Sequence, residues 1–308
     1  MDPRTISEIW TKLVKDGFFT TLTYEAERRY RKSIQHFSIG KESWILEVGC
    51  GTGRFHNLLR NVGFENIVSC DITFEHIARS RELNTRGLFV VARGESLPFR
   101  DSSFQHLVSN AAIEHFSAPE KGIVEFARVT EPGSQLVITS DCFVWRILQI
   151  LGLYRSRMPV DKAIAFPEFG RMFDAASLEI VDFDAWGVTH YLRRLQKAIP
   201  TISSKLLEST QRDESWVNRK PRSYWMNRLR MVFLDENLFL LRNVKTALAT
   251  SSQREANIDL ASVLGCPVCK NAVLHDAVSG AFACSVCRVS YPLREGVPIM
   301  LVEQARPL

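Results

Sequence analysis

The sequence predicts an α/β protein with a mainly parallel sheet of seven strands, helices on both faces of the sheet, and a small cysteine-rich domain after it. Three observations predict this class. Short apolar runs alternate with amphipathic segments, a glycine-rich turn follows the first run, and two CxxC pairs lie close to the C-terminus. Strands that alternate with helical segments are typical of β-α-β units with parallel pairing.

Seven short apolar runs are the candidates for the strands. Helical stretches separate the first five runs, so parallel connections are expected among them. In chain order, the runs are 44–48, 66–70, 88–92, 106–110, 135–139, 178–186 and 237–241.

A helical segment is expected ahead of the sheet, over residues 5–37. Thr5 and Glu8 have the spacing of a capping box. Apolar residues then recur at helical spacing, at Ile6, Ile9, Trp10, Leu13 and Val14. With the strand pattern this gives four expected parts: an N-terminal helical cap at 1–40, a sheet domain at 41–248, a polar linker at 249–262 and a cysteine-rich domain at 263–308.

Composition and charge narrow the class of protein. The chain has 308 residues, 45% of them hydrophobic and 24% charged, which is ordinary for a globular protein. Its net charge of +5 permits binding to nucleic acid without requiring it. No apolar run has the length of a membrane span, and the first residues lack the pattern of a secretory signal. Seven cysteines, an odd number, favour reduced thiols and a cytoplasmic location over a disulfide framework.

Residues 45–55 combine a strand, a glycine-rich turn and the start of a helix. The turn contains Gly49, Gly51 and Gly53, and a backbone without Cβ atoms can approach a ligand closely. Many nucleotide sites have such a turn, so by itself it is a weak signal. Glu47 lies two residues before the first glycine, where a carboxylate would repel a pyrophosphate on the following helix. The turn therefore suits a ligand with a cationic amino group.

The segment Glu47–Gly53 resembles motif I of class I S-adenosylmethionine (SAM) methyltransferases, and the stretch Gly94–Thr139 is similar to the ubiquinone-biosynthesis-type members. The resemblance implies a Rossmann-like, seven-stranded sheet and SAM as the cofactor. It also implies a set of cofactor-binding residues. These are Glu47, Gly49, Cys50, Gly51, Gly53, Asp71, Ile72, Gly94, Glu95 and Asn110.

Asp71, at the end of the second predicted strand, matches the acidic residue that binds the ribose in that family. A carboxylate there can accept both hydroxyl groups of a ribose. Both acidic residues also have a structural alternative, since Glu47 could cap a turn and Asp71 could cap the next helix. Arg93 departs from the family pattern, because an Asp often accepts from the adenine amino group there and Arg cannot accept. Backbone groups around Gly94, or Glu95, are the expected replacements.

The candidate catalytic residues lie just after predicted strands. Methyl transfer depends on alignment, and a general base helps only an acceptor that is a weak acid. His115, just after the fourth run, is a candidate base, with the orientation of its loop as the alternative role. His190 and Tyr191 are second candidates in the expected substrate lid at about 141–232. The sequence Asn-Ala-Ala-Ile at 110–113 lacks the Pro-Pro pattern of enzymes that methylate planar nitrogens, which favours transfer to oxygen or carbon.

Two segments of the expected lid bear on the acceptor. Residues 142–154 are nearly all apolar and too few to span a bilayer, so they form either a helix that packs on the pocket or an interfacial helix that collects a lipid-like acceptor. Residues 188–232 carry much of the basic excess, interleaved with Trp216, Tyr224 and Trp225. Such a segment could bind RNA or an acidic small substrate, or form a solvated face.

The C-terminal segment has the spacing C-x2-C-x14-C-x2-C, close to that of a four-thiolate zinc site. Four protein ligands leave no open position, so the site is expected to be structural. A segment of roughly forty residues can hardly bury a sufficient core alone, and zinc would stabilise it. The expected ligands are Cys266, Cys269, Cys284 and Cys287.

Residues 264–308 also resemble the Trm-type zinc-ribbon activator of tRNA and release-factor methyltransferases. The matching residues include Tyr291, Pro292 and the stretch 296–301. The resemblance implies a module that binds and stabilises a methyltransferase by covering apolar surface or pairing strand edges. Fusion in cis would give a high effective concentration and remove the need for a separate partner protein.

Three hypotheses for function follow. The first is a SAM-dependent methyltransferase acting on oxygen or carbon of a small or lipid-like metabolite, stabilised by its own zinc ribbon. The second is a tRNA methyltransferase that forms a methyl ester on a modified wobble uridine. The third is a SAM-fold scaffold without activity, which Arg93 leaves open and the intact acidic and glycine residues disfavour.

Overall fold

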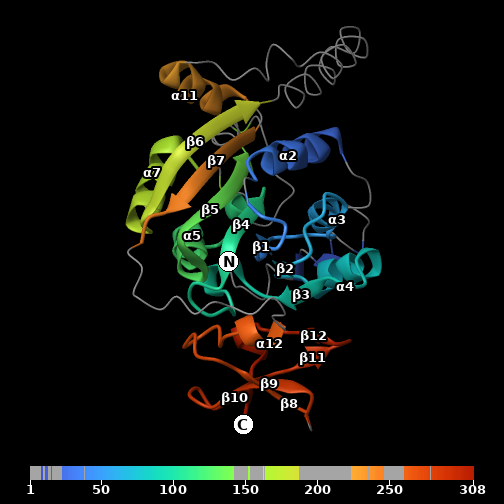
Figure 1. The fold of residues 1–308 in the computed structure, drawn as a ribbon. Helices are drawn as coiled ribbons and strands as arrows, with labels where there is room; N and C mark the ends of the chain where they lie inside the picture. The colour runs from blue at the N-terminus through green and yellow to red at the C-terminus, as the bar shows by residue number, and fades with distance from the viewer. Residues whose placement is uncertain are drawn as a thin grey trace.

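The protein is described from a computed structural model (Figure 1). The structure describes residues 23–37, 39–141, 164–186, 223–234, 236–245, 260–277 and 279–308, with isolated positions at 8, 9, 11, 12, 15, 152 and 162. His190, Tyr191 and nearly all of the apolar segment 142–154 lie outside the described residues, as does the basic insertion up to residue 222. The expectations about these segments therefore stay predictions.

The predicted seven-stranded sheet is confirmed. The strands lie in the order β3-β2-β1-β4-β5-β7-β6; the first five strands of the chain pair in parallel, and β7 runs antiparallel to both β5 and β6. Strand order reverses at β1 and β4, and ligands of such sheets bind at the carboxyl ends of the strands at this point. The strands are β1 (Ile45–Val48), β2 (Ile67–Asp71), β3 (Leu88–Val91), β4 (Phe104–Asn110), β5 (Thr130–Asp141), β6 (Leu178–Trp186) and β7 (Glu236–Asn243).

Strand β5 begins five residues earlier than the run that predicts it. Its pairing with β4 is interrupted, because Phe104 pairs with Thr130 while His106 pairs with Gln135. Gly133 has φ of 83°, a left-handed conformation that suits glycine. Residues 131–134 therefore bulge from the ladder.

Helices cover both faces of the sheet (Figure 1). Side chains of α5 and α7, such as Phe126 and Phe169, belong to the core on one face, and side chains of α2 and α3, such as Phe55, pack on the other. Successive residues of β1 point to opposite faces, with Ile45 in one core and Leu46 in the other. The helices of this domain are α2 (Tyr24–Gln35), α3 (Arg54–Asn61), α4 (Phe74–Leu83), α5 (Pro119–Val129), α7 (Phe166–Ala175) and α11 (Tyr224–Phe233), with short 3-10 turns η1 (Gly94–Ser96) and η2 (Ile113–His115).

The C-terminal domain is built from short strands. A four-stranded sheet has the order β13-β10-β9-β8, and β11 pairs with β12 in a separate hairpin. Its elements are α12 (Leu260–Val263), β8 (Leu274–Asp276), β9 (Ala281–Cys284), β10 (Val289–Tyr291), β11 (Leu293–Arg294), β12 (Val297–Pro298), η4 (Val302–Gln304) and β13 (Arg306–Pro307).

The C-terminal domain covers β3, the edge strand of the large sheet. Met300 donates its backbone N–H to the carbonyl of Val91 at 2.9 Å, and Ile299 forms a parallel bridge with the same residue. Leu264 bridges Phe99 in the antiparallel sense, and both side chains are fully buried. One apolar core runs through both domains. The junction thus pairs the last residue of this edge strand, and an unpaired sheet edge is otherwise a site for unwanted strand pairing.

Candidate functional site

The glycine-rich turn after β1 has the backbone that its glycines predict. Gly49 has φ of 76°, and a Cβ there would lie 2.4 Å from the Cβ of Ala112, so a side chain does not fit. Gly51 has φ of 51° and no heavy atom within 4 Å of the place where its Cβ would be. The turn is therefore closed on the side of β4 and leaves space at Gly51, where a ligand can approach the backbone.

Glu47 lies on β1 next to this turn and is 3% exposed. Its Oε2 accepts a hydrogen bond from the Ser69 hydroxyl at 2.7 Å. Burial raises the pKa of Glu47 to about 8; the Ser69 hydroxyl opposes this shift and the charge of Asp71 adds to it. A buried carboxyl group of this kind is stabilised in its ionised form by a cation placed beside it.

Asp71 closes the other side of the turn at the end of β2. It accepts hydrogen bonds from the backbone N–H groups of Gly51 at 2.9 Å and Thr73 at 3.0 Å, and its Oδ1 is 3.0 Å from Nδ1 of His76. Burial alone would raise the pKa of Asp71, but His76 and the two N–H groups hold it below its usual value. The carboxylate thus ties the glycine turn to the start of α4 and stays ionised.

Two other predicted positions, Cys50 in the turn and Ile72 just after β2, are apolar in character. Cys50 is buried, and burial raises the pKa of its thiol well above the usual value, so it stays a neutral thiol. Ile72 packs against the cluster that contains Cys50 and Ile77. Neither residue offers a charged group to a ligand.

Arg93, the residue that departs from the family pattern, forms an ion pair with the C-terminal domain. Its guanidinium is 2.8 Å from the carboxylate of Glu303 on η4, and the two side chains are 12% and 20% exposed. Glu95 is engaged elsewhere, since its carboxylate accepts from both the N–H and the hydroxyl of Ser117 at 2.8 Å. Gly94 has no room for a side chain, because a Cβ would lie 2.0 Å from the ring of Phe116. The carboxylate that the sequence lacks at position 93 is thus brought to it by Glu303.

The end of β4 presents Asn110. Its Oδ1 accepts from the hydroxyl of Ser33 on α2 at 2.6 Å, and the hydroxyl of Thr139 lies 3.4 Å away. Thr139 in turn accepts from the N–H of Ala111 at 3.0 Å. The Nδ2 of Asn110 is buried and has no hydrogen-bond partner among the described residues. This donor is therefore available to a ligand at the carboxyl end of the sheet.

His115 lies on η2, just beyond β4, and is half-buried. Its backbone N–H donates to the carbonyl of Ala112 at 3.0 Å. The position is at the same edge of the sheet as Glu47 and Asn110, because β1 and β4 are neighbours in parallel. His115 keeps both of its predicted roles, as a base or as a residue that orients its loop.

Sequence reasoning missed several polar residues that contact the predicted site residues or Arg93, among them Ser69, Ser33 and Glu303. Ser69 is the register partner of Glu47, and a polar residue opposite an acidic one on a buried strand was the available signal. Ser33 and Glu303 reach the site from α2 and from the C-terminal domain, and no local pattern indicated either contact.

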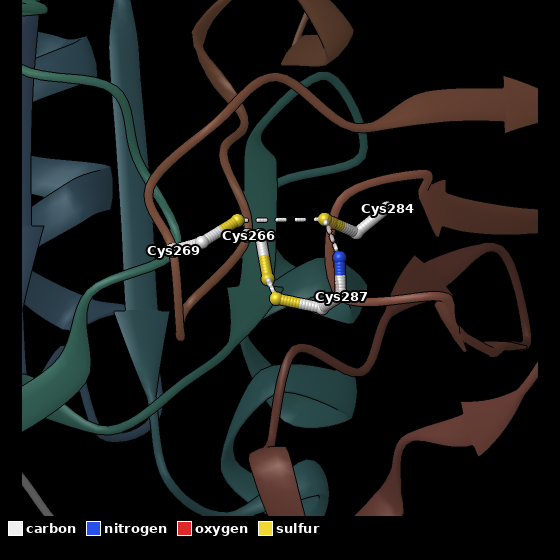
Figure 2. A group of neighbouring side chains, drawn as sticks. All are labelled: Cys266, Cys269, Cys284 and Cys287. Atoms are coloured by element: carbon white, nitrogen blue, oxygen red, sulfur yellow. Dashed lines mark hydrogen bonds between the residues drawn. The ribbon is translucent and has the colours of Figure 1, made fainter.

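The four predicted cysteines lie together in the C-terminal domain (Figure 2). Their sulfur atoms are all within 4.8 Å of one another, and none is in a disulfide. The Sγ atoms of Cys266 and Cys287 are 3.9 Å apart, and those of Cys269 and Cys284 are 3.5 Å apart. Tetrahedral zinc with Zn–S bonds of about 2.3 Å requires sulfur separations of roughly 3.8 Å, so the site fits this ion.

The surroundings of the cysteine cluster also suit a structural site. Tyr291 is fully buried, and its hydroxyl lies 3.4 Å from the sulfur of Cys266, where it can donate to a thiolate. Lys270, within the first cysteine turn, pairs with Glu125 of α5 at 2.8 Å. The cluster thus lies beside the junction between the domains, far in sequence from the glycine turn.

No helix among the described residues has the length and apolar character required to cross a membrane.

Two family models match the chain. One, described as a methyltransferase domain, matches residues 46–138, and the other, described as Trm112p-like protein, matches residues 257–296. A 47-residue stretch is 43% identical to a "UPF0434 protein" of Nitrosococcus oceani and covers 80% of that protein and 15% of this chain.

Curated relatives of the larger domain differ in name. "Probable tRNA methyltransferase 9B" of Mus musculus is 34% identical over 137 residues, which are 43% of this chain and 28% of the relative. "Malonyl-[acyl-carrier protein] O-methyltransferase" of Hamiltonella defensa is 31% identical over 100 residues, which are 32% of this chain and 38% of the relative. The chain therefore spans well under half the length of these two relatives.

Solved structures show the same fold. The chain matches the "Complex between the Haloferax volcanii Trm112 methyltransferase activator and the putative methyltransferase" with a TM-score of 0.54 and 16% identity, over 80% of this chain and 99% of that one. Geranyl diphosphate C-methyltransferase from Streptomyces coelicolor, solved with S-adenosyl-L-homocysteine, gives a TM-score of 0.50 and 12% identity over 71% of this chain and 79% of that one. Sheet order, both family matches and the cysteine cluster agree: the chain contains a class I SAM methyltransferase domain followed by a Trm112-like zinc-ribbon domain.

Proposed function

We propose that the protein transfers the methyl group of SAM to oxygen or carbon of a small or lipid-like metabolite. The observation that carries the proposal is the pair of buried carboxyl groups around the glycine turn. Glu47 suits the ammonium group of the methionine part, and Asp71 suits the two hydroxyls of the ribose. Two such groups on neighbouring strands, with space between them at Gly51, match the two polar ends of one ligand.

The adenine is proposed to lie beyond the ribose, over the end of β3. Strands β1, β2 and β3 follow one another across the sheet, so the three parts of the cofactor would meet their carboxyl ends in turn. Arg93 cannot accept from the adenine amino group, whereas Glu303, which it holds, can. The Trm112-like domain would then contribute one residue to the cofactor site.

The Trm112-like domain is proposed to act as a stabiliser in cis. It covers the edge of β3, shares the apolar core, and places four thiols at a spacing that suits structural zinc. Zinc held by four cysteines has no open position and would take no part in methyl transfer. His115, His190 and Tyr191 remain the candidate catalytic residues, and a base is needed only for an acceptor that is a weak acid.

Calorimetry with S-adenosylhomocysteine tests the cofactor. Binding is the expected result, and a purified, folded protein that binds neither this compound nor SAM would be the inactive scaffold of the third hypothesis. Labelled SAM incubated with cell extract, then divided into RNA, protein and organic-soluble fractions, tests the acceptor. We expect label in the organic-soluble fraction.

Transfer to tRNA is the second candidate, favoured by the similarity to "Probable tRNA methyltransferase 9B" and by the Trm112-like domain. The similarity to a malonyl-acyl-carrier-protein O-methyltransferase is almost as close and favours an oxygen acceptor. Label confined to a ribonuclease-sensitive fraction would replace the first candidate with the second.

A further inference from the structure

A chain of three buried polar side chains runs from α3 through β2 to β1. The Nδ1 atom of His56 lies 2.8 Å from the Ser69 hydroxyl, and this hydroxyl donates to Oε2 of Glu47 at 2.7 Å. All three residues are at most 3% exposed. Ser69 and Glu47 are direct register partners on parallel strands, so the contact is set by the sheet itself.

The direction of the hydrogen bonds follows from the donors available. When Glu47 is ionised, as a bound ammonium group would hold it, Ser69 gives its one hydroxyl hydrogen to the carboxylate, so Nδ1 of His56 must carry a proton and donate to the serine oxygen. Burial lowers the pKa of His56 to about 4, so the ring is neutral and Nε2 carries no proton. The ring packs on Phe89 with centroids 4.7 Å apart, which fixes its orientation.

The hydrogen bond from Ser69 fixes one carboxylate oxygen of Glu47 and leaves the other oxygen available to a ligand. Ser69 engages Oε2, and the described residues make no further hydrogen bond to this carboxyl group. Without Ser69, the Glu47 carboxyl group would lose this hydrogen bond in a buried position, and the ligand would have to fix its orientation at an entropic cost.

We propose that Ser69 and His56 are positioning residues that hold the Glu47 carboxylate for the ammonium group of SAM. The inference rests on the proposed function, because it assigns a role within the proposed cofactor site. A purely structural role is the alternative, since a buried polar chain also satisfies its own members.

Two ligands separate these roles. S-adenosylhomocysteine has the amino acid part, whereas 5′-deoxy-5′-methylthioadenosine has the same adenosine and sulfur but no ammonium group. Ser69→Ala is expected to raise the Kd of S-adenosylhomocysteine about tenfold, the cost of losing a hydrogen bond to a charged group. The Kd of methylthioadenosine is expected to change less than about twofold. His56→Phe keeps the packing on Phe89 and is expected to act in the same direction with a smaller effect.

Ser134→Ala is the matched control, because its buried hydroxyl donates to the carbonyl of Phe104 and does not contact the glycine turn. Ser69→Thr keeps the hydroxyl and should restore most of the affinity for S-adenosylhomocysteine. If Ser69→Ala does not fold, the His56→Phe variant carries the same ligand comparison.

The outcomes are distinct. Equal losses for the two ligands, or no loss for either in a folded variant, would overturn the positioning role. Wild-type protein that binds neither ligand would instead overturn the proposed function.

Discussion

Cofactor affinity should depend on pH through Glu47. Burial raises the pKa of this carboxyl group to about 8 in the protein without ligand, so the group is mostly protonated at pH 7. An ammonium group beside it favours the ionised form. Binding of S-adenosylhomocysteine should therefore release a proton, and its affinity should fall as the pH falls.

The magnitude follows from the position of this pKa. Between pH 7.5 and pH 6 the ionised fraction of a group with a pKa of about 8 falls roughly 25-fold, which corresponds to about 1.9 kcal/mol of binding free energy. The Kd should rise by the same factor, provided that the complex keeps Glu47 ionised.

The other titratable groups around Glu47 decide which ligand serves as the control for this pH dependence. Asp71 stays ionised because its pKa is lowered, while the pKa values of Cys50 and Tyr30 are raised above the window and that of His56 lies below it. Cys70, on β2, also has a pKa raised by burial and stays neutral. His76 contacts Asp71, so it would affect only the binding of the ribose, which both ligands share. Methylthioadenosine therefore reports every contribution except that of the amino acid part, which carries the ammonium group and a carboxylate.

Calorimetry at pH 7, in two buffers of different ionisation enthalpy, should show the release of about one proton with S-adenosylhomocysteine and fewer with methylthioadenosine. Glu47→Gln should flatten the difference between the two pH profiles. Parallel profiles for the two ligands in wild-type protein would refute the reasoning, because the ammonium group would then not meet a titrating carboxyl group.

Three further predictions concern the C-terminal domain. Glu303→Gln weakens the ion pair with Arg93 and should lower the free energy of unfolding in urea by about 1–3 kcal/mol. It should also raise the Kd of S-adenosylhomocysteine and methylthioadenosine by equal factors, since both carry adenine; an effect on one ligand alone would contradict the proposed adenine contact. Lys270→Ala should cost only about 1 kcal/mol in the same unfolding assay and leave both Kd values unchanged, because Glu125 keeps Arg128 as a partner. Cys284→Ser should lose zinc by elemental analysis and lower the Tm or cause aggregation, while the folded fraction binds S-adenosylhomocysteine normally; a well-folded variant without turnover would mean that the metal takes part in the reaction.

The large sheet was predictable because each strand is a short apolar run that can be recognised from the local sequence. All four residues of β1 and all five of β2 are buried, and turns with glycine or polar residues bound them. The exact ends of the strands were harder to predict from the sequence. Strand β7 extends from Glu236 to Asn243, beyond the run at 237–241, because its terminal residues pair with β5 and β6 at a distance in sequence.

The arrangement of the candidate site could be predicted only where one motif holds several of its residues. Glu47 and Asp71 flank the glycine turn, and the turn itself indicates where they must lie. The contact between Arg93 and Glu303 joins positions 210 residues apart. His56 contacts Ser69 through the packing of α3 on β2, and neither residue type suggests the pairing. Contacts of this kind depend on tertiary structure, which local patterns do not encode.

The end of β3 links the stability of the C-terminal domain to the proposed cofactor site. The carbonyl of Val91 accepts from Met300, the N–H of Ala92 donates to the carbonyl of Asp71 at 2.9 Å, and Arg93 pairs with Glu303. Three successive residues thus connect the edge of the sheet, the backbone of Asp71 and the Trm112-like domain. A ligand that binds only this docked arrangement must stabilise the junction by the same free energy with which the junction favours the ligand. A zinc-bound domain in cis would therefore support cofactor binding without contacting the methyl group, because it holds in place the backbone on which the adenine and ribose are proposed to rest.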